Sequence, residues 1–197
     1  MFPASGTPTH RFLLNQVWFA GLPSQERETI ASQVFTLSSP RGKVILPANE
    51  RTQGWYGVVQ GLVKISRRSA SGQRSDFLGV AAGDWFGEGA VLKNELRRYD
   101  VVALRDTELL CLPSAAFHTL FSTSLAFNQH LVGCMNLRLS QAMAMIEAGR
   151  TRNPEQRMAL SLSRLFWSRT RQLDLTQDEL ASLAGMSRQT ANRALNA

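Results

Sequence analysis

The sequence has few cysteines and no long apolar run, and each shortage excludes a class of protein. Cys111 and Cys134 are too few for a four-cysteine iron–sulfur or zinc site. Their apolar neighbours predict buried free thiols in a reducing compartment. No apolar run of about 18 residues is present, so no membrane-spanning helix is expected. The N-terminal segment has no basic region and no A-x-A cleavage pattern, so no signal peptide is predicted. We therefore expect a cytoplasmic protein.

Lysine is also scarce, and the positive charge of the chain is nearly all arginine. The chain has 22 Lys and Arg against 15 Asp and Glu, a net charge of +7, with only three lysines. Residues 150–197 have eight arginines and four acidic residues, so the excess is concentrated there. Such an excess is typical of proteins that bind an anionic partner, nucleic acid or a membrane surface, although solubility alone also explains it.

Short apolar runs alternate with glycine-bearing turns from Arg41 to Leu112. The runs are rich in Val, Leu and aromatic residues and recur about every ten residues, as in KVILPANE and WYGVVQGLVKISRR. This spacing predicts an antiparallel barrel or sandwich. Glycines stand between the runs, where turns need a positive φ or a close backbone approach: Gly42, Gly61, Gly72 and Gly83.

Helical patterns lie on both sides of this region. Ser24 is a candidate N-cap for a helix to about Phe35, and Ser114 for a short helix after the strands. Ser122 or Ser124 begins a longer helix to about residue 149.

The longer helix is apolar on more than one face and has few charges. In a protein of this size a second apolar face fits a partner subunit, so we expect a dimerisation helix. The alternative is a central helix in a monomeric core. Pro154 follows a break, and Asn153 or Thr151 is a candidate cap for a helix to about Arg169.

The segment LTQDELASLAGMSRQTANRALN, residues 175–196, has the pattern of a helix-turn-helix. Thr176 and Glu179 have the spacing of a capping box. Gly185 ends the first helix with a sharp turn, and Ser187 caps the second. The alternative is a generic helical hairpin with a polar outer face.

The outer face of the second helix has the side chains that read DNA. Arginine pairs with guanine and Gln or Asn with adenine, whereas hydroxyl groups suit phosphates. The candidate DNA-binding residues are Thr176, Ser187, Arg188, Gln189, Thr190, Asn192 and Arg193.

With this motif, the turn glycines and the GDWFGE run from Gly83 to Glu88, the chain resembles the CRP/FNR family of bacterial transcription regulators. The resemblance covers residues 12–197. It implies an α+β chain: an antiparallel β-barrel or jelly roll of the cyclic-nucleotide-binding type at 12–122, a dimerisation helix at 123–150, and a helix-turn-helix domain at 151–197. The sequence stops after Ala194-Leu195, short of the β-wing of family members, and we expect this to weaken DNA binding by this exact chain.

The resemblance implies a DNA-binding regulator, not an enzyme, with double-stranded DNA and a second copy as partners, RNA polymerase as a further candidate partner, and no membrane. The alternative is a ligand-binding or protein-interaction module that does not itself bind DNA. By the resemblance, Arg188, Gln189 and Arg193 occupy base-contacting positions. Gln189 stands where the CRP type has glutamate, which predicts a changed base preference because Gln favours adenine and Glu accepts from cytosine.

The resemblance also implies an effector pocket, whose glutamate accepts a ribose hydroxyl and whose arginine pairs with a cyclic phosphate. Gly87 and Glu88 fit the first part and Arg97 or Arg98 the second. The hydroxyl residue after the arginine is absent. The remaining candidate pocket residues are Tyr99, Asp100, Ala142 and Met143.

These replacements leave the effector open. The candidates are another nucleotide-like anion, no ligand at all, or cyclic AMP, which the missing hydroxyls disfavour. In an empty pocket, Arg98 and Asp100 would form a structural ion pair. The sequence lacks the N-terminal cysteine group of the FNR-type cluster, and no metal ligand set is expected.

Overall fold

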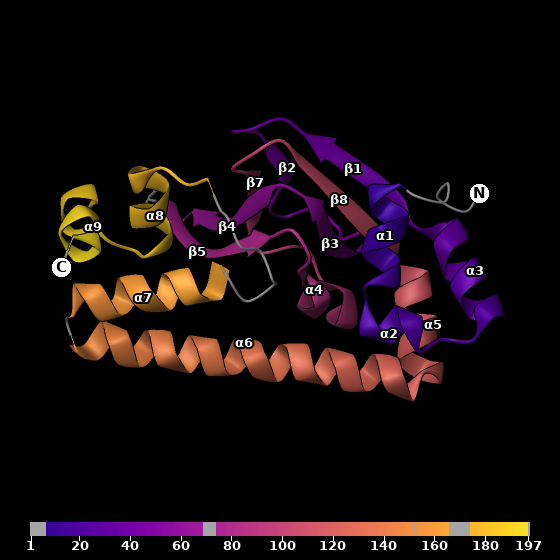
Figure 1. The fold of residues 1–197 in the computed structure, drawn as a ribbon. Coiled ribbons are helices and arrows are strands. Elements are labelled where there is room, and N and C mark those ends of the chain that lie inside the picture. Colours follow the sequence, from indigo (N-terminus) through magenta and orange to yellow (C-terminus); the bar gives the residue numbers. More distant parts are fainter. Residues whose placement is uncertain (1–6, 69–73, 152, 166–173, 197) are drawn as a thin grey trace.

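The structure, a computed structural model, describes residues 7–68, 74–151, 153–165 and 174–196. Three short helices precede eight strands, and the long helix α6 runs beneath them towards a small helical domain (Figure 1). The helices are α1 (Pro8–Leu14), α2 (Val17–Ala20), α3 (Ser24–Gln33), α4 (Glu88–Lys93), α5 (Ser114–Thr123), α6 (Leu125–Thr151), α7 (Pro154–Leu165), α8 (Gln177–Leu183) and α9 (Arg188–Leu195).

The eight strands form two four-stranded antiparallel sheets, which we call the β-domain. One sheet has the order β1-β8-β3-β6 and the other β2-β7-β4-β5. The strands are β1 (Phe35–Ser39), β2 (Val44–Leu46), β3 (Gly54–Gln60), β4 (Leu62–Arg68), β5 (Arg74–Ala81), β6 (Trp85–Phe86), β7 (Asp100–Ala103) and β8 (Thr107–Pro113). Buried side chains from both sheets, among them Val58 and Val101, fill the space between them. The predicted jelly-roll architecture is confirmed, as two sheets and not as a closed barrel.

The turn glycines predicted from the sequence have the expected backbone. Gly42, Gly61 and Gly83 all have positive φ, and Gly72 lies outside the described residues. At Gly61 an added Cβ would lie 2.5 Å from the carbonyl oxygen of Asp106, so both the φ and the space require glycine there.

Most predicted helix starts agree with the structure within one residue. Ser124, not Ser122, precedes α6, and its Oγ accepts from the Phe127 amide at 3.2 Å. Asn153 caps α7, since its Oδ1 accepts from the Gln156 amide. At α3 and α5 the predicted caps were wrong by one residue, because Pro23 and Pro113 hold the N-cap positions. A strand begins directly at Phe35, earlier than the predicted Arg41.

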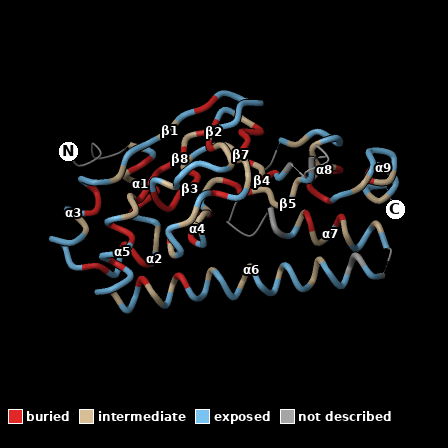
Figure 2. The backbone as a smooth tube through the Cα atoms, turned by 180° about the vertical axis from the view of Figure 1, so that it is seen from behind, coloured by how far each residue is buried: buried red, intermediate tan, exposed pale blue. Residues whose placement is uncertain are grey.

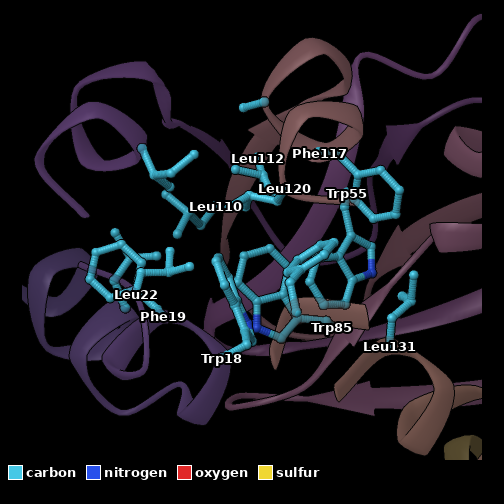
Figure 3. Packing of buried hydrophobic residues seen from close by; sticks show 14 of the residues in the cluster. Trp18, Phe19, Leu22, Trp55, Trp85, Leu110, Leu112, Phe117, Leu120 and Leu131 are labelled. Carbon is cyan, nitrogen blue, oxygen red and sulfur yellow. The ribbon is translucent and has the colours of Figure 1, made fainter. Parts of the chain in front are cut away.

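An aromatic cluster joins the N-terminal helices, the β-domain and α6 (Figure 3). The Trp55 and Trp85 rings stack with centroids 4.3 Å apart. Trp18 meets Phe127 of α6 edge to face at 5.2 Å. Phe127 is fully buried, so the start of α6 is fixed against the β-domain.

Beyond this anchor, one side of α6 remains exposed (Figure 2). Four large apolar residues recur every seven positions on it, and each is more than half exposed: Leu125, Val132, Leu139 and Ile146. No helix among the described residues is long and apolar enough to cross a membrane.

The packing at Gly54 makes a testable prediction about stability. An added Cβ would lie 2.0 Å from the carbonyl oxygen of Leu112, and this backbone atom belongs to the paired strand β8. We expect Gly54→Ala to lower the free energy of unfolding by ~2 kcal/mol or more. Thermal unfolding followed by circular dichroism measures it.

Gly133 of α6 is the matched control, because no atom of the described residues lies within 4 Å of an added Cβ there. Gly133→Ala should raise the free energy of unfolding by ~0.5–1 kcal/mol through its higher helix propensity. Equal melting temperatures for the two variants would contradict the packing argument.

Candidate ligand pocket and helix-turn-helix surface

A cavity of about 390 Å³ opens between the β-domain, α4 and α6. The inner faces of β4 and β5 supply Ile65 and Leu78, and the start of α4 supplies Gly87 to Ala90. The segment after α4 supplies Glu95, Leu96, Arg98 and Tyr99, and α6 supplies Arg138. The cavity therefore brings together segments far apart in the sequence, including half of the predicted pocket residues.

Glu88 is the buried acid of this cavity. Gly87 precedes it with φ +93°, and Glu88 begins α4 with only 8% of its surface exposed. Arg138 of α6 donates from Nη1 to Glu88 Oε1 and from Nη2 to the carbonyl oxygen of Trp85. The other oxygen, Oε2, is buried without a hydrogen-bond partner among the described residues. A buried carboxylate oxygen without a partner is costly, so a ligand hydroxyl that donated to it would be stabilised.

Arg138 was missed by the sequence reasoning, although the sequence contains a signal for it. It is the single Asp, Glu, Lys or Arg between residues 125 and 146. Burial lowers the pKa of Arg138, while nearby Asp84 opposes this shift. A lone charge in a long apolar helix indicates a partner on another element, here Glu88.

The structure distinguishes the two candidate arginines. Arg97 is 4% exposed and does not line the cavity; its guanidinium donates to the Pro47 carbonyl at 2.7 Å and lies over the Tyr56 ring. Arg98 lines the cavity, and its side chain is 75% exposed. Arg98 donates to Glu95 at 2.9 Å, a surface ion pair that an anionic ligand could displace at small cost. Arg98 is therefore the arginine available to a ligand.

Tyr99 and Asp100 take different positions after Arg98. Tyr99 lines the cavity, and a Cβ placed on Gly87 would lie 3.9 Å from its hydroxyl oxygen. Burial raises the pKa of Tyr99, so its phenol is neutral near pH 7. Asp100 instead accepts from the Ala48 amide at 2.8 Å. The alternative interpretation of an Arg98–Asp100 ion pair is wrong, because each residue uses another partner.

Ala142 and Met143 lie on α6 one turn beyond Arg138. Both are exposed, Met143 by 63%, and neither lines the cavity in this single chain. The structure thus places Gly87, Glu88, Arg98 and Tyr99 together and leaves Arg97, Asp100, Ala142 and Met143 outside. Near the cavity, Cys134 is half-buried with its Sγ 3.4 Å from His130 Nε2, whereas Cys111 is fully buried; both thiols are free.

The helix-turn-helix has the predicted local structure. Thr176 and Glu179 form the capping box at the start of α8. Gly185 has φ +63° in the turn, and Ser187 Oγ accepts from the Thr190 amide at the start of α9. Arg157 of α7 donates to the Ala184 and Gly185 carbonyl oxygens, which fixes the turn against α7.

The outer face of α9 presents polar side chains to solvent. Ala191 is fully buried against α7 and α8, so the opposite side of the helix points outwards. Arg188, Gln189, Asn192 and Arg193 are exposed. Arg188 forms only a surface ion pair with Asp178 at 3.4 Å. The Asn192 side-chain oxygen accepts from Gln177 and Asn196, which orients its amide.

Comparison with known proteins finds a family match for each of the two regions that contain these residues. Residues 36–124 match the cyclic nucleotide-binding domain family and residues 156–197 the Crp-like helix-turn-helix domain family. The "Cyclic AMP receptor protein" of Thermus thermophilus is 29% identical over 91% of this chain and 83% of its own length.

Solved structures show the same arrangement. The catabolite activator protein of Thermus thermophilus is 28% identical over 91% of this chain and 84% of its own, with a TM-score of 0.57. A putative transcriptional regulator of the CRP/FNR family from Eubacterium rectale is 18% identical over 92% of this chain and 85% of its own, with a TM-score of 0.69, and has the same fold. With its nucleotide-type β-domain, long helix and helix-turn-helix, the chain belongs to the CRP/FNR family of DNA-binding transcription regulators.

Proposed function

We propose that this regulator binds a hydroxyl-bearing anion between Glu88 and Arg98 and transmits that binding to the helix-turn-helix. The observation that supports this most is the buried Oε2 of Glu88, which has no hydrogen-bond partner in the described part of the chain and lies at a cavity lined by Arg98 and Arg138. The proposed division is an effector domain at 12–122, a dimerisation helix at 123–150 and a DNA-binding domain at 151–197. The protein acts by binding and not by catalysis, in the cytoplasm.

The proposed effector is a nucleotide-type anion other than cyclic AMP. Cyclic AMP is the ligand in the names of the relatives, and Glu88 and Arg98 suit its ribose and phosphate. Tyr99, however, replaces the small hydroxyl residue next to the phosphate, and Ala142 and Met143 have no group that binds an adenine amine. A lost hydrogen bond to a charged group costs ~1.5–3 kcal/mol, which is roughly one to two decades of affinity.

Calorimetry with cyclic AMP, cyclic GMP and cyclic di-GMP tests this proposal. We expect cyclic AMP to bind wild type weakly, and Tyr99→Ser to raise its affinity about tenfold, because the substitution restores a hydroxyl and opens the cavity. Tyr99→Phe is the matched control, since it keeps the ring and removes only the phenol oxygen. Micromolar cyclic AMP binding by wild type would refute the preference against it.

We propose that α9 enters the major groove of double-stranded DNA. Its proposed base contacts are Arg188, Gln189 and Arg193, with Asn192 beside them. Thr176, Ser187 and Thr190 are proposed phosphate contacts. The Thr176 and Ser187 oxygens accept amide hydrogen bonds as helix caps. The Ser187 and Thr190 hydroxyls share a hydrogen bond at 2.9 Å, which leaves one of their two protons to donate to a phosphate.

Selection of bound sequences from random DNA tests the role of Gln189. We expect Gln189→Glu to change the preferred base at one half-site position from adenine to cytosine, because glutamate accepts from the cytosine amine. Affinity should fall steeply with salt for both proteins, since phosphate contacts release counterions. The same selected sequence for both proteins would argue against base reading by Gln189.

We also propose that α6 pairs with a second copy. Its exposed apolar residues at 125, 132, 139 and 146 have the seven-residue spacing of a coiled-coil seam. Regulators of this family are commonly dimeric, and a symmetric dimer presents two recognition helices to a palindromic site.

Analytical ultracentrifugation tests the seam. Leu139→Glu places a charge in the centre of the apolar stripe and should convert the dimer to monomer. Ser140→Glu adds the same charge at the next position, which is exposed and outside the stripe, and should leave the dimer intact. Equal dimer dissociation constants for the two variants would show that the apolar stripe of α6 is not the dimer interface.

A further inference from the structure

The helix-turn-helix is bound to the β-domain by an arginine clamp on Glu179. Arg105, just before β8, donates from Nη1 to Glu179 Oε1 at 2.9 Å and from Nη2 to Oε2 at 3.0 Å. Arg41 donates to Oε1 at 3.1 Å. The side chains of Arg105 and Glu179 are 19% and 15% exposed, so this pair is partly desolvated. A bidentate arginine–carboxylate contact of this kind is stronger and more directional than an ordinary surface ion pair.

A second polar contact lies along the same interface. Asp76 of β5 accepts from Lys64 of β4 at 2.7 Å and from Ser182 of α8. The Asp76 side chain is 4% exposed. Burial by itself raises the pKa of Asp76, but hydrogen bonds from Lys64 and Ser182 outweigh it and leave the pKa below its ordinary value. The carboxylate is therefore ionised, and it binds α8 through the Ser182 hydroxyl.

An apolar cluster completes the contact. Leu62, Ala81 and Leu104 of the β-domain are buried together with Leu183 of α8. The interface thus has an apolar centre with the Arg105–Glu179 and Asp76–Ser182 contacts beside it.

The strand pair beneath α8 also forms the wall of the effector cavity. Side chains alternate along β4, so Leu62 and Lys64 face α8 while Ile65 faces the cavity. On β5 Ala81 faces α8 and Leu78 the cavity. The register shifts after Ile65, where one extra residue of β5 returns Asp76 to the side of α8. The two faces of one strand pair therefore contact the cavity and the helix-turn-helix.

We propose that the Arg105–Glu179 and Asp76–Ser182 contacts form a latch that restrains the helix-turn-helix on the β-domain and lowers its affinity for DNA until it opens. The first helix of a helix-turn-helix crosses the DNA backbone. Here the N-terminal turn of α8, with Thr176 and the Glu179 carboxylate, lies against Arg41 and Arg105. The β-domain thus occupies the side from which a phosphate would approach this turn.

The latch is coupled to the cavity through β4 and β5. A ligand that contacts Ile65 or Leu78 displaces strands whose other face binds α8, so occupancy of the cavity and closure of the latch influence each other. The coupling would regulate DNA binding through the proposed effector site, and it therefore rests on the proposed function. The existence of the latch can be tested without DNA or effector.

Hydrogen exchange followed by mass spectrometry tests the latch on the whole chain. We expect Arg105→Gln to raise exchange about tenfold in residues 177–183 and 74–81 and to leave other strands unchanged. Arg11→Gln, which removes the same charge from an exposed position of α1, should change neither segment. Glu179→Gln keeps the capping box, because glutamine also serves there, and should have the effect of Arg105→Gln.

The double variant Arg105→Gln/Glu179→Gln should exchange no faster than either single variant, because the two residues act as one contact. Unchanged exchange in both single variants would overturn the latch. Coupling is tested by Ile65→Ala, which should raise exchange in 177–183. Leu46→Ala removes a side chain from the same apolar cluster, but on β2, and should leave exchange in 177–183 unchanged. Equal effects of the two alanine variants would overturn the coupling.

Binding to a fluorescent mixed-sequence duplex at low salt tests the direction of control. We expect Arg105→Gln to bind at least fivefold more tightly than Arg11→Gln, although both have lost one positive charge. Equal or weaker binding would overturn inhibition by the latch. If neither protein nor wild type bound DNA, the proposed DNA-binding function and the inhibitory role would both fail, and the exchange data would still decide whether the contact acts as a latch.

Discussion

The attachment of α6 to the tryptophan cluster is the constraint on which the rest of the molecule depends. Phe127 and Leu131 are buried among Trp18, Trp55 and Trp85, so the N-terminal end of the helix is fixed to the β-domain. A helix rises about 1.5 Å per residue, so a helix fixed at one end determines where every later side chain lies. Arg138 therefore reaches Glu88, and the C-terminal end of α6 places α7 and α8 in contact with β5.

The same geometry explains how one helix has three surfaces. Its first turns bury aromatic residues, its middle presents Arg138 to the cavity, and its free side has an apolar stripe. The sequence of α6 therefore has no single apolar face, because apolar residues lie on more than one side of the helix. In the proposed dimer, the cavity, the stripe and the DNA-binding domain share one rigid element, which is a physical basis for communication between them.

The β4–β5 strand pair is a second connection between the cavity and the helix-turn-helix. Its inner face lines the cavity, and its outer face holds α8 through Asp76, Leu62 and Ala81. In the proposed regulation, a displacement at the cavity reaches α8 through these strands, because alternate side chains of one backbone contact both. The extra residue of β5 beside Ile65 interrupts the strict alternation and returns Asp76 to the side of α8.

Much of the fold was predictable from local signals. Turn glycines, helix caps and the capping box depend on residues close in sequence. Gly61 has the predicted positive φ, and Ser124 and Thr176 form the predicted cap hydrogen bonds. The boundaries were less predictable, since Pro23 and Pro113 took the caps expected of the serines after them. The site was predicted in part: Gly87, Glu88 and Tyr99 line the cavity, but Arg97 and Asp100 do not.

The sequence by itself determined the elements, the family and the polar face of α9, because these depend on spacing along the chain. Only the tertiary structure chose Arg98 over Arg97, since adjacent residues of an extended segment point to opposite sides and burial decides which side is the cavity. Only the tertiary structure paired Arg138 with Glu88, 50 residues apart, and Arg105 with Glu179, 74 residues apart. Contacts over such separations follow from how the elements pack, and no local pattern encodes them.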